Sequence, residues 1–517
     1  AQAVSLIPFL CLDMGFSFRY AFHGLSFAAG TVVVPTNQQL DFLHNVGLSQ
    51  FMHYSIEPFV FPHQEHNCMT EEGHGGPGPY PPDPQCLPSS KFDPSHLSTD
   101  QWVETAVAFG ASEICVTAHH EGGFALWDTK YNLNYTVAFS PYKKDILRQF
   151  VNSCKKHGVR ICYYWGPSAN GWLKQHAKSA DEFLELQHSQ LSELLLNYGP
   201  VSRLWWDHYP FGCGGHGNAD RHADCPNGTF PDAWPSFVSQ VRKLSGQTLI
   251  CPGPDCVGHL GEGGQGSYPV WLTCNKSACP LTWTKDGRPK NAPGVKGGDL
   301  FMPRETCSTP IDDWFSTGDG EGAAIFTVFE YWNRFLSSVG QGMVNTFNAP
   351  PCITGQIPAA IASKMRALGD LTRPLYNPHS SVTNVTAPCI EATLELDVAW
   401  EFNAIVTRED LHQGQRIAGY TIEWLGANGI WYPLAAKCSG AVGLGCLHGI
   451  SVGAMVVDIL NDTSPPGKIR FRCTEALGDP VNLRSFGVAR VYPPSQPNPP
   501  NLPGSSKTPP QMFHVVI

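Results

Sequence analysis

The chain has 517 residues, of which 42% are hydrophobic, and it carries a formal net charge of −10 at pH 7. This length leaves room for two or three domains, and the acidic balance excludes binding of nucleic acid through a broad basic surface. Its apolar runs stay well short of twenty residues, so we expect no membrane anchor.

The first residues indicate a processed chain. The sequence starts at Ala1 rather than at methionine, and its first apolar run, Val4 to Leu12, has no basic segment before it. That run is too short to span a bilayer. We expect residues 1–34 to form an N-terminal extension.

Residues 35–377 alternate predicted strands with predicted helices, which is typical of βα units around a mainly parallel sheet. In chain order we predict a helix capped by Thr99 or Asp100, the strand 113–117, a helix 142–157, the strand 159–164, a helix 179–198, a strand that ends at Asp207, a helix 233–244 and the strand 247–251. Gly158 and Gly199 are placed to end two of the helices. Polar residues follow each strand, as at the active face of a (β/α)8-like barrel.

Residues 378–492 consist of short predicted strands separated by turns. The strands are 392–396, 402–407, 420–424, 455–459, 468–473 and 486–492. This pattern predicts a C-terminal antiparallel β-sandwich. We expect the Pro-rich tail 493–517 to be extended and the Gly/Pro stretch 72–90 to be a surface loop.

The cysteines indicate disulfides. There are eighteen, with local pairs such as Cys251/Cys256 and Cys274/Cys279, and no Cys-x-x-Cys pair suggests a zinc site. Sequons for N-glycosylation occur at Asn134, Asn227, Asn275, Asn384 and Asn461. We therefore expect an oxidising compartment and a secreted or lysosomal/vacuolar glycoprotein.

A carboxylate stands at the end of one predicted strand. Arg203-Leu-Trp-Trp-Asp207-His208 is an apolar, β-type run that stops abruptly at Asp207. In α/β barrels the carboxyl ends of the strands form the floor of the active site, so Asp207 is a candidate catalytic group. The alternative is that Asp207 only caps the loop after the strand.

Four segments occur in a specific order and combination. They are Phe51-Met-His-Tyr-Ser55, Val116-Thr-Ala-His-His-Glu-Gly-Gly-Phe-Ala-Leu-Trp127, Trp205-Trp-Asp207 and Val339-Gly-Gln-Gly-Met343. Together they resemble the α-L-fucosidases of glycoside hydrolase family 29. The resemblance extends over about residues 35–490, because Glu409-Asp-Leu411 followed by Gly414-Gln-Arg-Ile417 is similar to that family's β-sandwich domain.

The resemblance implies a retaining exo-α-L-fucosidase that hydrolyses terminal α-L-fucose from glycans or glycoconjugates by double displacement, with Asp207 as the nucleophile. The sugar contacts that it implies are His53, Glu65, His119, His120, Tyr164, Trp205 and Trp127. From residue type alone, each histidine could equally be structural, each tryptophan could be plain core, and Tyr163 could take the place of Tyr164.

One segment departs from the family. Many members carry Glu-Trp after the first histidine strand, whereas this chain has Phe61-Pro-His-Gln-Glu65-His66. Glu65 is retained and the tryptophan is not. We therefore expect the edge of the pocket that meets the leaving group to differ.

A retaining mechanism needs a second, protonated carboxyl group. Glu262 lies in the Gly-rich stretch after the strand 247–251, in a Gly-x-Glu-x-Gly setting before Tyr-Pro that resembles one branch of the family. A nearby ionised aspartate would raise the pKa of Glu262. Glu305 is the second choice, because Arg304 beside it favours an ion-paired carboxylate, and Asp255 is the third.

Two other functions stay open at this level. The chain could be a barrel glycosidase of another specificity, similar to α-galactosidases, or a catalytically inactive fucose-binding protein. We expect no metal, because the histidines show no His-Glu-x-x-His spacing and a two-carboxylate mechanism needs none. We also expect no cofactor, because Tyr268-Pro269 stands where the helix of a nucleotide site would begin after Gly261–Gly266.

Overall fold

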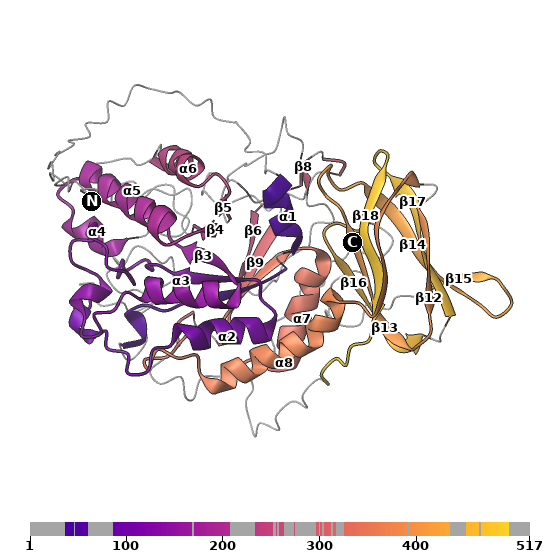
Figure 1. The fold of residues 1–517 in the computed structure, drawn as a ribbon, viewed down its shortest axis with the longest axis horizontal. Coiled ribbons are helices and arrows are strands. Elements are labelled where there is room, and N and C mark those ends of the chain that lie inside the picture. Colours follow the sequence, from indigo (N-terminus) through magenta and orange to yellow (C-terminus); the bar gives the residue numbers. More distant parts are fainter. Residues whose placement is uncertain are drawn as a thin grey trace, which may run out of the picture.

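The structure, a computed structural model, describes residues 37–45, 47–59, 86–167, 170–206, 233–251, 255, 258–262, 273–274, 296–298, 300–301, 304–311, 314–316, 325–389, 392–434, 451–464 and 467–495. Two parts lie side by side, one built of strands and helices and the other of strands alone (Figure 1). The expected N-terminal extension, residues 72–85 of the expected loop and most of the Pro-rich tail lie outside the described residues.

The first part is organised around one curled parallel sheet with the strand order β5-β4-β3-β2-β1-β10-β9-β6. Its strands are β1 (Leu48–Met52), β2 (Glu113–Thr117), β3 (Arg160–Tyr164), β4 (Val201–Trp205), β5 (Leu249–Ile250), β6 (Gly258–Glu262), β9 (Arg304–Ser308) and β10 (Val344–Asn348). The predicted (β/α)8-like barrel is therefore confirmed. A separate small ribbon pairs β7 (Thr273–Cys274) with β8 (Leu300–Phe301).

Helices cover the outside of this sheet (Figure 1). They are α1 (Asn37–Asn45), α2 (Thr99–Phe109), α3 (Ile146–His157), α4 (Gly171–His176), α5 (Ala180–Asn197), α6 (Ala233–Leu244), α7 (Val328–Ser337) and α8 (Ala359–Tyr376), with 3-10 turns η1 (Glu57–Phe59), η2 (Ser89–Lys91), η3 (Val137–Phe139) and η5 (Val339–Gln341). No described helix is both long enough and apolar enough to cross a membrane.

Three predicted helix ends needed correction. The helix predicted over 142–157 starts at Ile146, because the Asp145 side chain accepts from Arg148 N as the N-cap. The N-cap of α2 is Ser98, whose side chain accepts a hydrogen bond from Gln101 N, so the helix starts at Thr99 instead of being capped there. Gly158 caps α3 in the left-handed conformation, as predicted, with φ at 68°. Gly199 does not do this for α5, whose C-cap is Tyr198.

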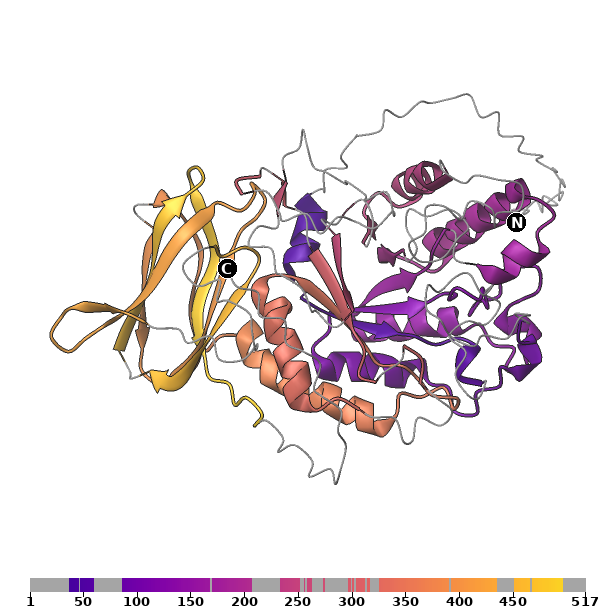
Figure 2. The ribbon, with the colours of Figure 1, turned by 180° about the vertical axis from the view of Figure 1, so that it is seen from behind.

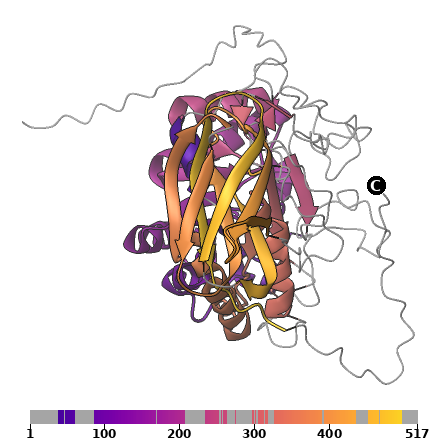
Figure 3. The ribbon, with the colours of Figure 1, turned by 90° about the vertical axis from the view of Figure 1, so that its right-hand side faces the viewer.

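The second part is the predicted β-sandwich, seen from its own side in Figure 3. One antiparallel sheet has the order β11-β18-β13-β16 and the other β12-β17-β14-β15. The strands are β11 (Ser380–Ala387), β12 (Thr393–Val398), β13 (Phe402–Glu409), β14 (Ile417–Leu425), β15 (Trp431–Pro433), β16 (Val456–Ser464), β17 (Gly467–Ala476) and β18 (Val481–Ala489). Sequence patterning missed β11 and β15, two edge strands with few buried residues.

The two parts meet through α1, α8 and η5 on the barrel side and β13, β16 and β18 on the sandwich side. Figure 2 shows α7 and α8 on the side of the barrel that faces the sandwich. Polar contacts from α1 reinforce this junction. The His44 ring nitrogen Nε2 accepts from Leu411 N at 3.1 Å, and Arg484 donates to Asn45 Oδ1 at 2.6 Å.

Disulfides are present in both parts. Cys115 and Cys162 occupy directly opposed positions on β2 and β3 and are bonded to each other. In the sandwich, Cys389 is bonded to Cys473 of β17. Cys251 is also disulfide-bonded, while its predicted partner Cys256 and the pair partner Cys279 lie outside the described residues.

Candidate active site

Aromatic side chains meet at the carboxyl ends of the barrel strands. The Tyr164 ring, at the end of β3, stacks on Trp205 at the end of β4 with centroids 5.5 Å apart and an angle of 13°. On its other side Tyr164 stacks on His120, with centroids 5.1 Å apart. His53, which follows β1, lies 5.7 Å from both His120 and Tyr164. We call His53, His120, Tyr164 and Trp205 the strand-end cluster.

Strand alternation decides which member of each aromatic pair joins the cluster, because successive side chains point to opposite faces. Tyr163 belongs to the outer core, and its hydroxyl donates to Tyr198 O at 2.8 Å. Trp206 likewise packs near Trp165, with ring centroids 6.4 Å apart. Tyr164 and Trp205 are consequently the inward residues of β3 and β4.

Hydrogen bonds fix the tautomer of His53. Asn348 Nδ2 donates to Trp314 O at 2.7 Å, so Asn348 Oδ1 is an acceptor, and it lies 3.2 Å from His53 Nδ1. The ring proton is therefore assigned to Nδ1, which leaves Nε2 as an acceptor. Burial, with a smaller effect from His120, holds the pKa of His53 well below its usual range, so the imidazole is neutral.

His119 faces a different environment from His120. Its ring is 6.4 Å from Trp127, nearly parallel, and 6.0 Å from Trp165. Nδ1 lies 3.0 Å from His120 O and donates to it, while Nε2 is buried without a hydrogen-bond partner in the described part of the chain. Burial lowers the pKa of His119 to about 4. His119 and Trp127 thus lie beside the strand-end cluster rather than within it, and Trp127 donates to Glu193 Oε2 at 3.0 Å.

Several residues near the cluster were missed by sequence reasoning. Trp314 and Phe315 follow β9, and the Phe315 ring lies 4.9 Å from His120 and 5.6 Å from His53. Glu57 and Glu121 are buried carboxyl groups just after β1 and β2. Burial raises the pKa of Glu57 to about 7, and the charge of Glu121 adds to the rise. Only Glu121 had a signal in the sequence, because it follows the predicted strand 113–117 by four residues. The sequence pattern predicted no strand directly before Glu57, Trp314 or Phe315.

Glu305 is held in a buried ionic network. Its Oε1 accepts from Arg203 Nη1 at 2.5 Å, from Thr346 Oγ1 at 2.8 Å and from Trp205 Nε1 at 2.9 Å. Arg203 also pairs with Glu113 at 2.7 Å. The ion-pair partner of Glu305 is Arg203 and not the expected Arg304. Neighbouring residues along a strand point to opposite faces of the sheet, so Glu305 faces inward residues of other strands. Glu305 thereby orients Trp205 of the strand-end cluster.

The other two candidates for the second carboxyl group occupy different places. Asp255 is buried, pairs with Arg242 Nη2 at 2.5 Å and accepts from Ile250 N at 2.7 Å, so it anchors α6 to β5. Glu262 was expected in a loop, but its backbone ends strand β6, beside Cys307 of β9. The pattern gave no strand there because Gly258-His-Leu-Gly-Glu262 has little apolar character, and pairing with β9 supplies the order.

Some predicted site residues lie outside the described residues, namely Asp207, Glu65, Asn227 and Asn275, and for Asn461 only the backbone is described. Asp207 follows Trp205, the last residue of β4, by two positions. Asn134 and Asn384 are exposed.

A second polar group lies at the junction with the sandwich. Ligand atoms of Asp41, His44 and His412 come within 4.8 Å of one another. His412 Nδ1 lies 2.5 Å from Asp410 and its Nε2 lies 3.2 Å from Asp41. Because His44 Nε2 already accepts from Leu411 N, the group is accounted for by contacts between α1 and the sandwich.

Comparison with known proteins finds similarity to α-L-fucosidases. Residues 80–214, which include β2, β3, β4 and both histidines after β2, match the family model described as alpha-L-fucosidase. In this segment the chain is similar to the α-L-fucosidases. It is 24% identical over 429 residues to alpha-L-fucosidase 1 of Arabidopsis thaliana, covering 75% of this chain and 76% of that protein.

Solved structures show the same fold. A family 29 glycoside hydrolase from an unknown rumen bacterium aligns with a TM-score of 0.65 and 23% identity, covering 91% of this chain and 79% of that one. A Ruminococcus gnavus family 29 fucosidase in complex with fucose aligns with a TM-score of 0.63 and 18% identity, covering 89% of this chain and 95% of that one. At these identities the two solved structures show a shared fold.

Proposed function

We propose that this chain is a retaining exo-α-L-fucosidase with Asp207 as nucleophile and Glu262 as acid/base. The observation that carries the proposal is the strand-end cluster. Trp205 closes β4 beside Tyr164, with the rings of His120 and His53 next to them. Asp207 follows Trp205 by two positions in the sequence, and barrel enzymes in general place their chemistry at the carboxyl ends of the strands.

The proposed reaction proceeds in two steps. The Asp207 carboxylate attacks the anomeric carbon while Glu262 protonates the departing glycosidic oxygen, which forms a covalent fucosyl enzyme. Glu262, now a carboxylate, then takes a proton from water as the water attacks the same carbon. The sugar leaves with its original α configuration, and Asp207 is released as a carboxylate.

The strand-end cluster fits recognition of a deoxy sugar. The neutral His53 offers the lone pair of Nε2 to a sugar hydroxyl. Tyr164, Trp205 and Phe315 offer apolar ring surface for the methyl group of fucose. Fixed acceptors and an apolar wall in one place are what a small-molecule site requires.

We also propose that the protein works in an oxidising compartment, secreted or lysosomal/vacuolar, as a glycoprotein. Two disulfides in two different domains support this, because cytosolic thiols are kept reduced. The exposed Asn134 and Asn384 are accessible to glycosylation. Treatment of protein from a eukaryotic host with peptide N-glycosidase should lower its mass, and an unchanged mass would contradict glycosylation.

A panel of 4-nitrophenyl glycosides tests the proposed activity. We expect hydrolysis of the α-L-fucoside and no comparable hydrolysis of the α-galactoside. Fucose binding without turnover of any glycoside would instead indicate the catalytically inactive sugar-binding protein.

The stereochemistry of the product tests the mechanism separately. Double displacement predicts that the first sugar released from an α-fucoside is α-L-fucose. Proton NMR during the first minutes, before mutarotation equilibrates the anomers, reads this directly. Initial release of β-L-fucose would exclude the mechanism while leaving the specificity intact.

A further inference from the structure

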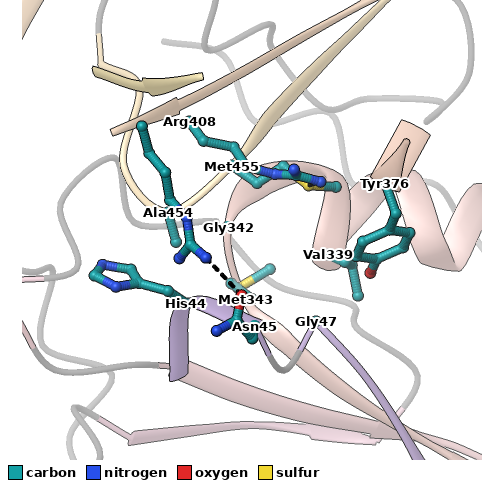
Figure 4. A pocket seen from close by; sticks show the side chains of 11 residues that line it. His44, Asn45, Gly47, Val339, Gly342, Met343, Tyr376, Arg408, Ala454 and Met455 are labelled. Carbon is teal, nitrogen blue, oxygen red and sulfur yellow. Dashed lines mark hydrogen bonds between the residues drawn. The ribbon is translucent and has the colours of Figure 1, made fainter. Parts of the chain in front are cut away.

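A cavity of about 150 Å³ lies at the junction between barrel and sandwich. Gly47 and Met343 in its lining directly precede β1 and β10, so the cavity is next to the amino ends of these strands and not to their carboxyl ends. Its lining comes from α1, η5, α8, the strands β13 and β18, and the residues just before β16. Figure 4 shows side chains from both parts of the molecule around it. The lining residues are His44, Asn45, Gly47, Val339, Gly342, Met343, Tyr376, Arg408, Ala454, Met455 and Arg484.

Two arginines line this junction cavity, and their known partners are neutral. Arg408 Nη2 donates to Leu375 O at 3.3 Å and lies 3.5 Å from Met455 Sδ. Arg484 Nη2 donates to Asn45 Oδ1, the contact drawn as a dashed line in Figure 4. Within the described residues, neither guanidinium is within ion-pair distance of a carboxylate.

The carboxylates of Asp41 and Asp410 lie near the junction cavity but contact His412. Neither residue lines the cavity. Residues 435–450, which precede the cavity-lining Ala454 and Met455 along the chain, include neither Asp nor Glu. No carboxylate is therefore among the described residues that line the cavity beside the two arginines.

This arrangement is unfavourable without an anion. Burial lowers the pKa of Arg408, and the charge of Arg484 lowers it further, whereas the Tyr376 hydroxyl acts in the opposite direction. A buried charge that lacks a counter-charge destabilises the folded state. The Tyr376 hydroxyl, which also lines the cavity, is buried without a hydrogen-bond partner among the described residues. It can therefore donate a hydrogen bond to a bound ligand.

We propose that the junction cavity binds a small oxyanion between Arg408 and Arg484, and that the bound anion stabilises the docking of the sandwich on the barrel. Guanidinium groups form paired hydrogen bonds with the oxygens of phosphate, sulfate and carboxylates, so an oxyanion is the class that fits two arginines and a tyrosine hydroxyl. The site is distinct from the sugar site, because none of its lining residues belongs to the strand-end cluster.

The test is calorimetric unfolding of the full chain at constant ionic strength, with sodium phosphate, sodium sulfate or sodium acetate exchanged for sodium chloride. For a chain of 517 residues, a ligand that binds the folded state and is present at about ten times its Kd should raise Tm by about 1–2 °C. We expect that rise with phosphate or sulfate in the wild type. Acetate should produce it as well only if the site also accepts monocarboxylates.

Matched variants separate the site from a general salt effect. Arg408→Gln and Arg484→Gln each remove one guanidinium and should abolish the anion-dependent rise, whatever their Tm in chloride. Arg366→Gln removes an exposed charge from the same helix as Tyr376 and should keep the rise. An equal rise in all four proteins, or none in the wild type with any of the three anions, would overturn the proposal.

Discussion

Asp207 is the residue whose replacement tests the chemistry most directly. Asp207→Asn keeps the side-chain volume and removes the nucleophilic charge, so we expect kcat on an activated aryl fucoside to fall by at least about a thousandfold with Tm nearly unchanged. Asp128→Asn, an exposed aspartate, is the control and should keep full activity. Retention of more than about a tenth of wild-type turnover would show that Asp207 is not the nucleophile.

The acid/base assignment rests on the contrast between Glu262 and Glu305. Glu262→Ala should lose activity on substrates with poor leaving groups but still react with an activated aryl fucoside, and azide should restore turnover with α-fucosyl azide as product. Glu305→Gln should show no azide rescue, because Glu305 is tied to Arg203, Thr346 and Trp205. Azide rescue of the Glu305 variant alone would transfer the role to Glu305.

At the scale of elements, one arginine holds several barrel strands together. Arg203 of β4 contacts Glu113 of β2, Glu305 of β9 and Thr346 of β10. It also donates to Ser49 of β1 at 3.3 Å. Because strands far apart in the sequence share this one side chain, it fixes their register toward each other and, through Glu305, the orientation of Trp205.

Removal of this arginine should therefore weaken the barrel. Arg203→Met leaves two buried carboxyl groups without a counter-charge, and we expect the free energy of unfolding to fall by about 3–5 kcal/mol. Urea unfolding followed by tryptophan fluorescence measures this loss. The exposed Arg366→Met is the control, and a triple variant that adds Glu113→Gln and Glu305→Gln should recover part of the loss. A fall of less than about 1 kcal/mol would contradict a stabilising role.

At the scale of the whole molecule, buried histidines predict a dependence of stability on pH. Burial lowers the pKa of His119 from 6.5 to about 4. Above pH 6.5 the His119 imidazole is neutral in both the folded and the unfolded protein. Between pH 6.5 and about 4 the imidazole is protonated in the unfolded protein and stays neutral in the folded protein. The contribution of His119 to stability is therefore lost as pH falls from about 6.5 to 4, by about 3 kcal/mol in total.

A comparison of variants isolates this contribution from the other groups. Glu57 changes the free energy of unfolding in the opposite direction. Its pKa is raised to about 7, so its contribution to the stability of the folded state increases as pH falls through that value. His119→Asn should reduce the loss of unfolding free energy between pH 7 and pH 4, while the exposed His96→Asn should not. Identical pH profiles for His119→Asn and the wild type would show that His119 is not the group responsible.

Patterns that are local in the chain were sufficient for part of the molecule. The periodicity of apolar residues located β2, β3 and β4 and the helices between them, and turn-separated short strands located most of the sandwich. The segments around His119-His120 and Trp205-Trp-Asp207 indicated the family before any coordinates. Such signals are readable from sequence because hydrogen bonding within a helix and alternation along a strand involve only neighbouring residues.

The tertiary structure alone decided which side chains meet. Alternation along β3 allows either Tyr163 or Tyr164 to face inward. Only the pairing of β3 with β2 and β4 in the curled sheet places Tyr164 beside His120. Glu305 has Arg304 as its sequence neighbour, yet its partner is Arg203, about a hundred residues earlier. The strand at Glu262 likewise exists through pairing with β9 rather than through its own composition. These outcomes depend on the relative phase and register of strands distant in the chain, which no local pattern specifies.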